Sequence, residues 1–179
     1  MLRAGLLVGT TVATAGGAEA IAAAVAALGA TTVALEADLC DEEAVGASAA
    51  ELGPVAVLVC DTAPAFVAAG GGIGGLAVAL EGAWNATRAV ANAVWRPSDG
   101  GRAVLVGARP RDGAHTAALG AALENTARTL SIEWARYGIR CSAVLPGDAT
   151  SADELASLIA YLASPAGDYF TGCVFTLGA

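Results

Sequence analysis

Residues Gly138–Gly147 read GIRCSAVLPG and give the clearest indication of the fold of this chain. The apolar run Arg140–Leu145 has the length of a strand, follows a glycine that ends the helical pattern Ala117–Tyr137, and stops at Pro146-Gly147. A helix that leads into a nearly continuous apolar strand is typical of a parallel sheet covered on both faces. We therefore expect an α/β fold.

Outward from this stretch, apolar runs of strand length alternate with segments of helical character. The other expected strands are Leu6–Thr10, Thr32–Leu35, Val55–Cys60, Ala103–Gly107 and Cys173–Leu177, and the other helices are Ala18–Leu28, Glu42–Leu52, Leu76–Trp95 and Ala152–Ala163. The alternation predicts a three-layer, Rossmann-like, doubly wound parallel sheet of about six strands in a single domain spanning residues 1–179. The segment Gly70–Gly75 follows no strand directly and is predicted to be a flexible connection rather than a phosphate loop.

Composition and charge narrow the function. The 17 acidic and 9 basic residues give a net charge of -8, which disfavours nucleic acid and anionic membranes as partners, and the 56% hydrophobic content excludes disorder. All nine basic residues are arginine, so the chain contains no lysine. An apolar N-terminus after Arg3 could be a signal peptide, but we favour a buried strand.

The cysteines and the single histidine do not form a metal-binding pattern. Cys40, Cys60, Cys141 and Cys173 are widely spaced and contain no CxxC pair, and His115 is the only histidine. We expect free thiols in a reducing cytoplasm, and no metal site.

Several segments resemble the short-chain dehydrogenase/reductase family. Residues 138–147 are similar to the family's YGIRVNAVxPG, Thr129–Tyr137 to its SLALELAPY, and Glu36–Val45 to its xADVTDEEAV. Val57–Ala63 resembles VLVNNAG, and Leu158–Gly172 resembles the family's LxFLASDxAxYITG ending. The resemblance covers nearly the whole chain and implies the family's Rossmann-like fold.

The resemblance also implies where catalytic groups would stand. The family uses a Tyr as proton donor or acceptor, a Lys four residues later, a Ser that orients the substrate carbonyl, and an Asn that holds a water. Counted along this chain, these positions fall on Thr116, Gly120, Ala108 and Ala79 respectively. Because the chain has no lysine, we expect that it has no catalytic residues of this kind and is not an enzyme by itself.

The family's cofactor loop, TGxxxGxG, is also altered. The matching stretch Thr11–Ala18 retains few of these glycines, so we expect no cofactor in this chain and only a turn at Gly9, Gly16 and Gly17. Glu36 and Asp38 lie where a ribose-binding acid would be expected, yet their surroundings resemble the end of the family's third strand. One strand–helix unit and the substrate lid would then be missing, with Thr32–Leu35 beside the first strand.

We therefore expect a degenerate family member that assembles with a catalytically complete short-chain dehydrogenase or ketoreductase, which would hold NAD(P). The predicted interface comprises Trp84, Leu123, Leu130 and Trp134 on two long apolar helices. Two alternatives stay open: an enzyme with other chemistry built from His115, Thr116, Asp61 or Asp148, and a self-associating module, such as a homodimer, that binds a small ligand.

Overall fold

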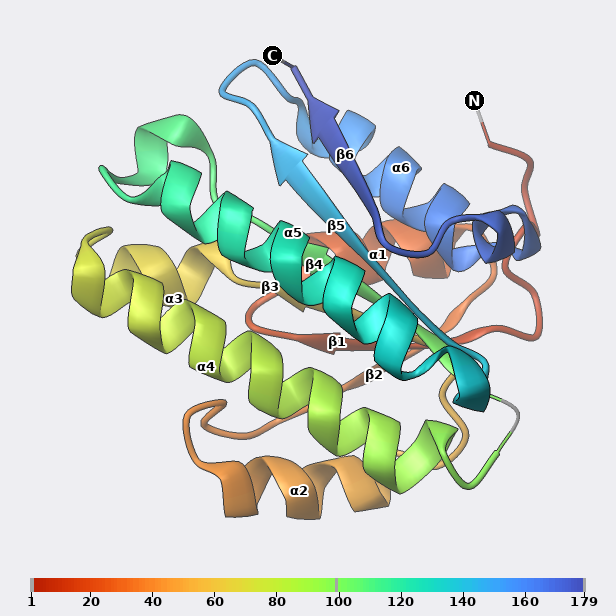
Figure 1. Ribbon diagram of the computed structural model, residues 1–179. Coiled ribbons are helices and arrows are strands. Elements are labelled where there is room, and N and C mark those ends of the chain that lie inside the picture. The colour runs from red at the N-terminus through yellow and green to blue at the C-terminus, as the bar shows by residue number, and fades with distance from the viewer. Residues whose placement is uncertain (1, 99, 179) are drawn as a thin grey trace.

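The computed structural model describes residues 2–98 and 100–178 and shows a parallel sheet between two helical layers (Figure 1). The strand order is β2-β1-β3-β4-β5-β6, and all neighbouring strands are parallel. The strands are β1 Thr11–Ala15, β2 Thr31–Ala34, β3 Val57–Asp61, β4 Gly101–Val106, β5 Ile139–Pro146 and β6 Cys173–Leu177. The predicted Rossmann-like α/β fold is confirmed.

The helices cover both faces of this sheet. They are α1 Glu19–Ala27, α2 Glu42–Glu51, α3 Ala63–Ala68, α4 Ile73–Val90, α5 Thr116–Glu133 and α6 Ala152–Ala163, and α4 continues into a π-helix at Ala91–Trp95. In Figure 1, α2, α4 and α5 cover one face, and α1 and α6 cover the other. None of the helices in the described ranges is long and apolar enough to cross a membrane.

Side chains spaced three or four residues apart attach α5 to the sheet. Leu119, Leu123, Ala127 and Leu130 are at most 2% exposed and form one stripe of the core. On the same face, Trp95 is fully buried and donates its indole N–H to the carbonyl oxygen of Val55 (2.8 Å). This satisfied donor lets the π-helix carry the largest side chain of the core.

The first strand lies further along the chain than expected. The sequence predicts it at Leu6–Thr10, but the strand is Thr11–Ala15, and residues 4–9 form turns. Gly5 and Gly9 have φ of 74° and 82°, which breaks the extended run, while Leu7 is fully buried from within these turns. The apolar run therefore reflects burial of a turn and not a strand.

The second strand confirms a more specific prediction. β2 pairs with β1 over Thr11↔Thr31 to Thr14↔Ala34, so the strand before Glu36 does lie beside the first strand. Whether a strand–helix unit and a lid have been lost relative to the family stays a prediction.

The glycine-rich segment is more ordered than expected. Gly70 and Gly71 form the turn after α3, Gly72 caps α4, and Gly74 and Gly75 belong to α4 itself. A Cβ on Gly75 would lie 2.5 Å from the Phe66 carbonyl oxygen, so glycine permits close packing of α4 on α3 there. The prediction of a flexible connection is wrong for this half of the segment.

Candidate functional site

The candidate site lies at the carboxyl edge of the sheet, between β1 and β3. From these neighbouring strands the chain leaves in opposite directions, into α1 on one face and α3 on the other. Such a topological switch point leaves a crevice where ligands bind in open parallel sheets. The turn Gly16–Ala18 follows β1; Asp61 is the last residue of β3, and Thr62 follows it.

Glycine is required where the two chain segments meet. A Cβ on Gly16 would lie 2.0 Å from the Asp61 carbonyl oxygen, and φ at Gly16 is 77°. At Gly17, where φ is 84°, the nearest atom would be Pro64 Cγ at 3.2 Å. The turn after β1 is thus held against the end of β3, which fixes the position of Asp61.

A cavity of about 380 Å³ opens at this junction. Its walls come from the turn after β1, the segment 37–40, the end of β3, α3 and α4. Most of the lining is small and apolar, and the acidic side chains are Asp38 and Asp61. The lining residues are Gly16, Gly17, Ala37, Asp38, Leu39, Cys40, Cys60, Asp61, Thr62, Pro64, Ala65, Ala68, Val78, Ala79, Gly82 and Ala83.

Asp61 has an unusual acidity for a carboxylic acid. Burial, reinforced by the negative charges of Asp112 and Glu19, raises the pKa of Asp61 from 3.8 to about 6. The hydrogen bond that its Oδ1 accepts from the Ala63 N–H (3.0 Å) and the charge of Arg109 act in the opposite direction. A carboxyl group that titrates near neutral pH marks this junction as the chemically distinctive part of the crevice.

The segment 37–40 carries a second carboxylate, that of Asp38. Asp38 Oδ1 accepts a hydrogen bond from the Cys40 N–H (3.0 Å). Burial, together with the charges of Glu81 and Asp38, raises the pKa of the Cys40 thiol. Both ends of the cavity therefore carry carboxylates.

The family's catalytic positions carry no titratable side chains here. Ala108 follows β4, Thr116 begins α5, Gly120 is one turn further along α5, and Ala79 lines the cavity from α4. A Cβ on Gly120 would lie 3.3 Å from Leu145 Cδ1, so the Leu145 side chain occupies the space beside the position of the family's Lys.

The loop between β4 and α5 lies at the carboxyl edge of the sheet and is held there by hydrogen bonds of Arg109. Arg109 Nη1 donates to the carbonyl oxygens of Gly147 (3.1 Å) and Thr150, and the Arg109 N–H donates to Asp112 Oδ2 (2.7 Å). A Cβ on Gly71 would lie 2.7 Å from the Asp112 carbonyl oxygen, so the turn after α3 abuts the same loop.

The four residues predicted as candidates for other chemistry are dispersed around this loop. Asp148 is exposed and accepts from the Arg111 N–H (2.9 Å), while Thr116 Oγ1 donates to the Gly113 carbonyl (3.2 Å). His115 Nδ1 is buried without a hydrogen-bond partner among the described residues. No hydrogen bond within the described ranges joins His115, Thr116, Asp61 or Asp148 to one another. Of the four, only Asp61 lines the cavity.

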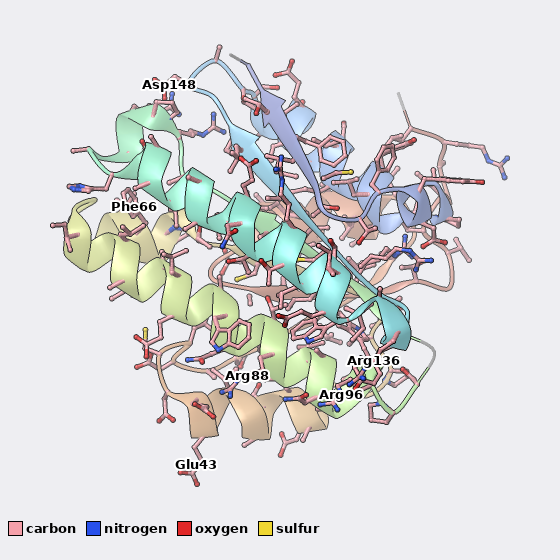
Figure 2. All side chains as sticks on the ribbon, viewed as in Figure 1. Glu43, Phe66, Arg88, Arg96, Arg136 and Asp148 are labelled. Carbon is pink, nitrogen blue, oxygen red and sulfur yellow. The ribbon has the colours of Figure 1, made fainter. Side chains whose placement is uncertain are left out.

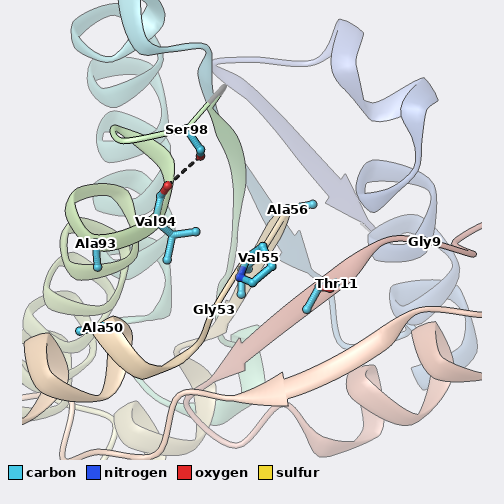
Figure 3. Close-up of a pocket in the computed structure, with 10 residues that line it drawn as sticks. Gly9, Thr11, Ala50, Gly53, Val55, Ala56, Ala93, Val94 and Ser98 are labelled. Carbon is cyan, nitrogen blue, oxygen red and sulfur yellow. Dashed lines mark hydrogen bonds between the residues drawn. The ribbon is translucent and has the colours of Figure 1, made fainter.

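Gly9 lies far from the other two glycines of the predicted turn, because β1 separates it from Gly16 and Gly17. It borders a groove of about 560 Å³ at the amino edge of the sheet (Figure 3). The side chains there are mostly small, and the Ser98 hydroxyl donates to the Val94 carbonyl (2.7 Å). The groove offers no titratable side chain, which leaves the carboxyl edge as the candidate site.

The four predicted interface residues divide into two groups. Leu123 and Leu130 are 0% and 2% exposed and belong to the core beneath α5. The prediction that they contact a partner is therefore wrong. Trp84 is 42% exposed, and its ring stacks on Trp134 with centroids 6.4 Å apart. The predicted apolar face thus consists of the tryptophan pair.

Comparison with solved structures assigns the fold. The chain is similar to a citronellol catabolism dehydrogenase (AtuB) of Pseudomonas aeruginosa PAO1, with TM-score 0.78, 24% identity, and coverage of 100% of this chain and 98% of the other. It is also similar to a hydroxysteroid dehydrogenase from Escherichia coli, with TM-score 0.75, 18% identity and coverage of 96% and 97%. BdcA (YjgI) from E. coli gives TM-score 0.72, 23% identity and coverage of 96% and 99%. The chain has a short-chain-dehydrogenase-like fold.

No protein-family model and no curated protein matches the sequence. The solved structures nevertheless contradict the expectation that this chain is not an enzyme. Two of the three similar structures are named as dehydrogenases.

The turn after β1 does not fit the dinucleotide that such a fold commonly binds. Only Gly16, Gly17 and Ala18 separate β1 from α1, and the first turn of α1 carries Glu19. A diphosphate at this helix N-terminus would meet the carboxylates of Glu19 and Asp61, and no lining residue of the adjoining cavity is an arginine, lysine or histidine. Like charge in a poorly solvated crevice opposes binding of a diphosphate there.

Proposed function

We propose that this chain is one subunit of an oxidoreductase and assembles with a short-chain dehydrogenase chain that carries the family's Tyr–Lys pair. The fold and the two named dehydrogenases support the oxidoreductase. The lack of any lysine supports a partner, because the family's hydride transfer uses a lysine. In this proposal NAD(P) binds in the partner's cleft, and the assembly works in the cytoplasm, where the buried thiols of Cys60 and Cys141 stay reduced.

The observation that carries the proposal is the tryptophan pair formed by Trp84 on α4 and Trp134, which directly follows α5. Trp84 is 42% exposed, stacks on Trp134, and has the Arg88 guanidinium 5.9 Å from its ring centroid. Tryptophan and arginine are enriched among the interface residues that contribute most of the binding free energy. The surface of Trp84, Trp134 and Arg88 is therefore the best candidate for the contact with a partner.

Co-purification tests the proposal. The tagged chain is expressed with its genomic neighbours, and the eluted complex is identified by mass spectrometry and assayed for NAD(P)H-dependent reduction. We expect a stoichiometric short-chain dehydrogenase with an intact YxxxK motif, whose activity falls when this chain is omitted.

The control for this experiment is a matched pair of variants. Trp84→Arg should abolish co-elution, because it places a second cation beside Arg88 in the contact. Val8→Arg changes another exposed apolar residue, 74% exposed in the N-terminal turns, and should leave the complex intact. A stable homodimer that excludes the dehydrogenase, or a complex indifferent to Trp84→Arg, would overturn the proposal.

A further inference from the structure

We propose that the cavity between β1, β3 and α4 binds a compact organic cation, a protonated amine on an apolar body, in place of a phosphate-bearing ligand. This inference goes beyond the proposed function and needs no partner chain. It concerns the 380 Å³ cavity described above, whose size lies within the usual range for small-molecule sites.

The two carboxylates of the cavity are hydrogen-bond acceptors. Asp61 and Asp38 each use Oδ1 to accept one backbone N–H, from Ala63 and Cys40 respectively, at 3.0 Å. Each therefore has a second carboxylate oxygen with no hydrogen-bond donor among the described residues. The hydroxyl of Thr62 donates to the Val106 carbonyl (2.7 Å) and is not available as a donor to a ligand.

An ammonium group complements such a site. It has three donors and no acceptor, and its hydrogen bonds to carboxylates are charge-assisted. A phosphate or carboxylate would meet like charge, and the lining contains no arginine, lysine, histidine, asparagine or glutamine to bind it. The small side chains of α3 and α4, among them Ala65, Ala68 and Ala83, leave room for the apolar body.

The surroundings of Asp61 supply a second line of argument. The charged groups near it are Asp112 and Glu19, which are negative, and Arg109, whose Nη1 binds the carbonyls of Gly147 and Thr150. Ionised Asp61 is therefore incompletely neutralised, and its burial destabilises the folded chain. A bound cation would remove this penalty, which gives the cavity a strong preference for positive charge.

Calorimetric titration of the purified chain tests this inference with three probes of equal length: n-hexylamine, 1-hexanol and hexanoate. At pH 7.5 we expect hexylamine to bind at least tenfold more tightly than hexanol and hexanoate not to bind. At pH 5 the preference for the amine should shrink severalfold, because Asp61 becomes protonated. Asp61→Asn should remove the preference for the amine, whereas Glu43→Gln, which Figure 2 shows on α2 pointing away from the molecule, should leave it unchanged.

A second variant keeps the test decisive if Asp61→Asn misfolds: Asp38→Asn should weaken hexylamine binding severalfold without affecting hexanol. Equal binding of amine and alcohol, any binding of hexanoate, or quenching of tryptophan fluorescence by NADH that Asp61→Asn does not change would overturn the inference. These titrations use the chain alone. Their outcome therefore does not depend on whether the chain co-purifies with a dehydrogenase.

Discussion

Two regions at the carboxyl edge of the sheet differ in chemistry although both lie where neighbouring parallel strands end. The crevice between β1 and β3 places the carboxyl group of Asp61 against a turn of two glycines and beside an acidic cavity. Around the ends of β4 and β5, where the family's proton-transfer residues would stand, the positions are Ala108 and Gly120, and Leu145 packs against Gly120. Polar side chains are thus concentrated at the switch point, and the second region carries small and apolar side chains.

The two regions also differ in the contacts that hold their residues in place. At the first region, the Gly16 backbone contacts the Asp61 backbone, so adding even one methyl group should be costly. At the second, the contacts are between flexible apolar side chains that can move by a few tenths of an ångström. A glycine-to-alanine substitution should therefore be much more costly at the first region than at the second.

Gly16→Ala should have the largest effect on stability. The added Cβ would lie 2.0 Å from the Asp61 carbonyl oxygen, a backbone atom, and φ of 77° is strained for any residue with a side chain. We expect a loss of about 3 kcal/mol or more in the free energy of unfolding, measured by urea denaturation. Gly9→Ala is the matched control, because φ is 82° there but nothing lies within 4 Å of the new atom. It should cost only about 1 kcal/mol, and equal losses at the two positions would refute the backbone contact.

Asp61→Asn should have the next largest effect and should act in the stabilising direction. The folded chain holds the pKa of Asp61 at about 6, above its ordinary 3.8, so the folded state binds more protons than the unfolded state between these values. Stability contributed by this group is present below pH 4 and is lost as the pH rises to about 6. Asparagine can still accept from the Ala63 N–H, and we expect the variant to be more stable by about 2 kcal/mol at pH 7.5 but not at pH 4. Denaturation curves across this range measure the difference, and a gain that did not depend on pH would contradict burial as its cause.

Most of the fold follows from the sequence, because parallel strands buried on both faces have an apolar pattern that few other structures share. The run Arg140–Leu145 lies within β5, and the strand before Glu36 pairs beside β1 as expected. The prediction for the first strand is wrong because Leu6–Thr10 is as apolar as the runs that do form strands. Only the positive φ angles of Gly5 and Gly9, which a sequence does not display, turn this run into loops.

The site is less predictable than the fold. Matching to the family locates its Ser, Tyr and Lys positions at Ala108, Thr116 and Gly120, but no pattern in the chain indicates that Leu145 packs against Gly120. Asp61 is one of several candidates in the sequence, and its distinction comes from burial and from the charges of Asp112 and Glu19, which are distant along the chain. Leu123 and Leu130 are wrongly predicted at an interface, because an apolar pattern does not say whether a helix packs on its own sheet or on a partner.

Gly120→Ala should have the smallest effect, and it completes the comparison with Gly16→Ala. Its Cβ would approach Leu145 Cδ1 to 3.3 Å, and Leu145 is only half-buried, so the leucine can shift to accommodate it. Alanine also gains up to about 1 kcal/mol over glycine inside a helix such as α5, which offsets the crowding. We expect the free energy of unfolding to change by less than about 0.5 kcal/mol in either direction by urea denaturation. A loss approaching that of Gly16→Ala would show that the surroundings of Gly120 are as rigid as those of Gly16, and the contrast between the two regions would then fail.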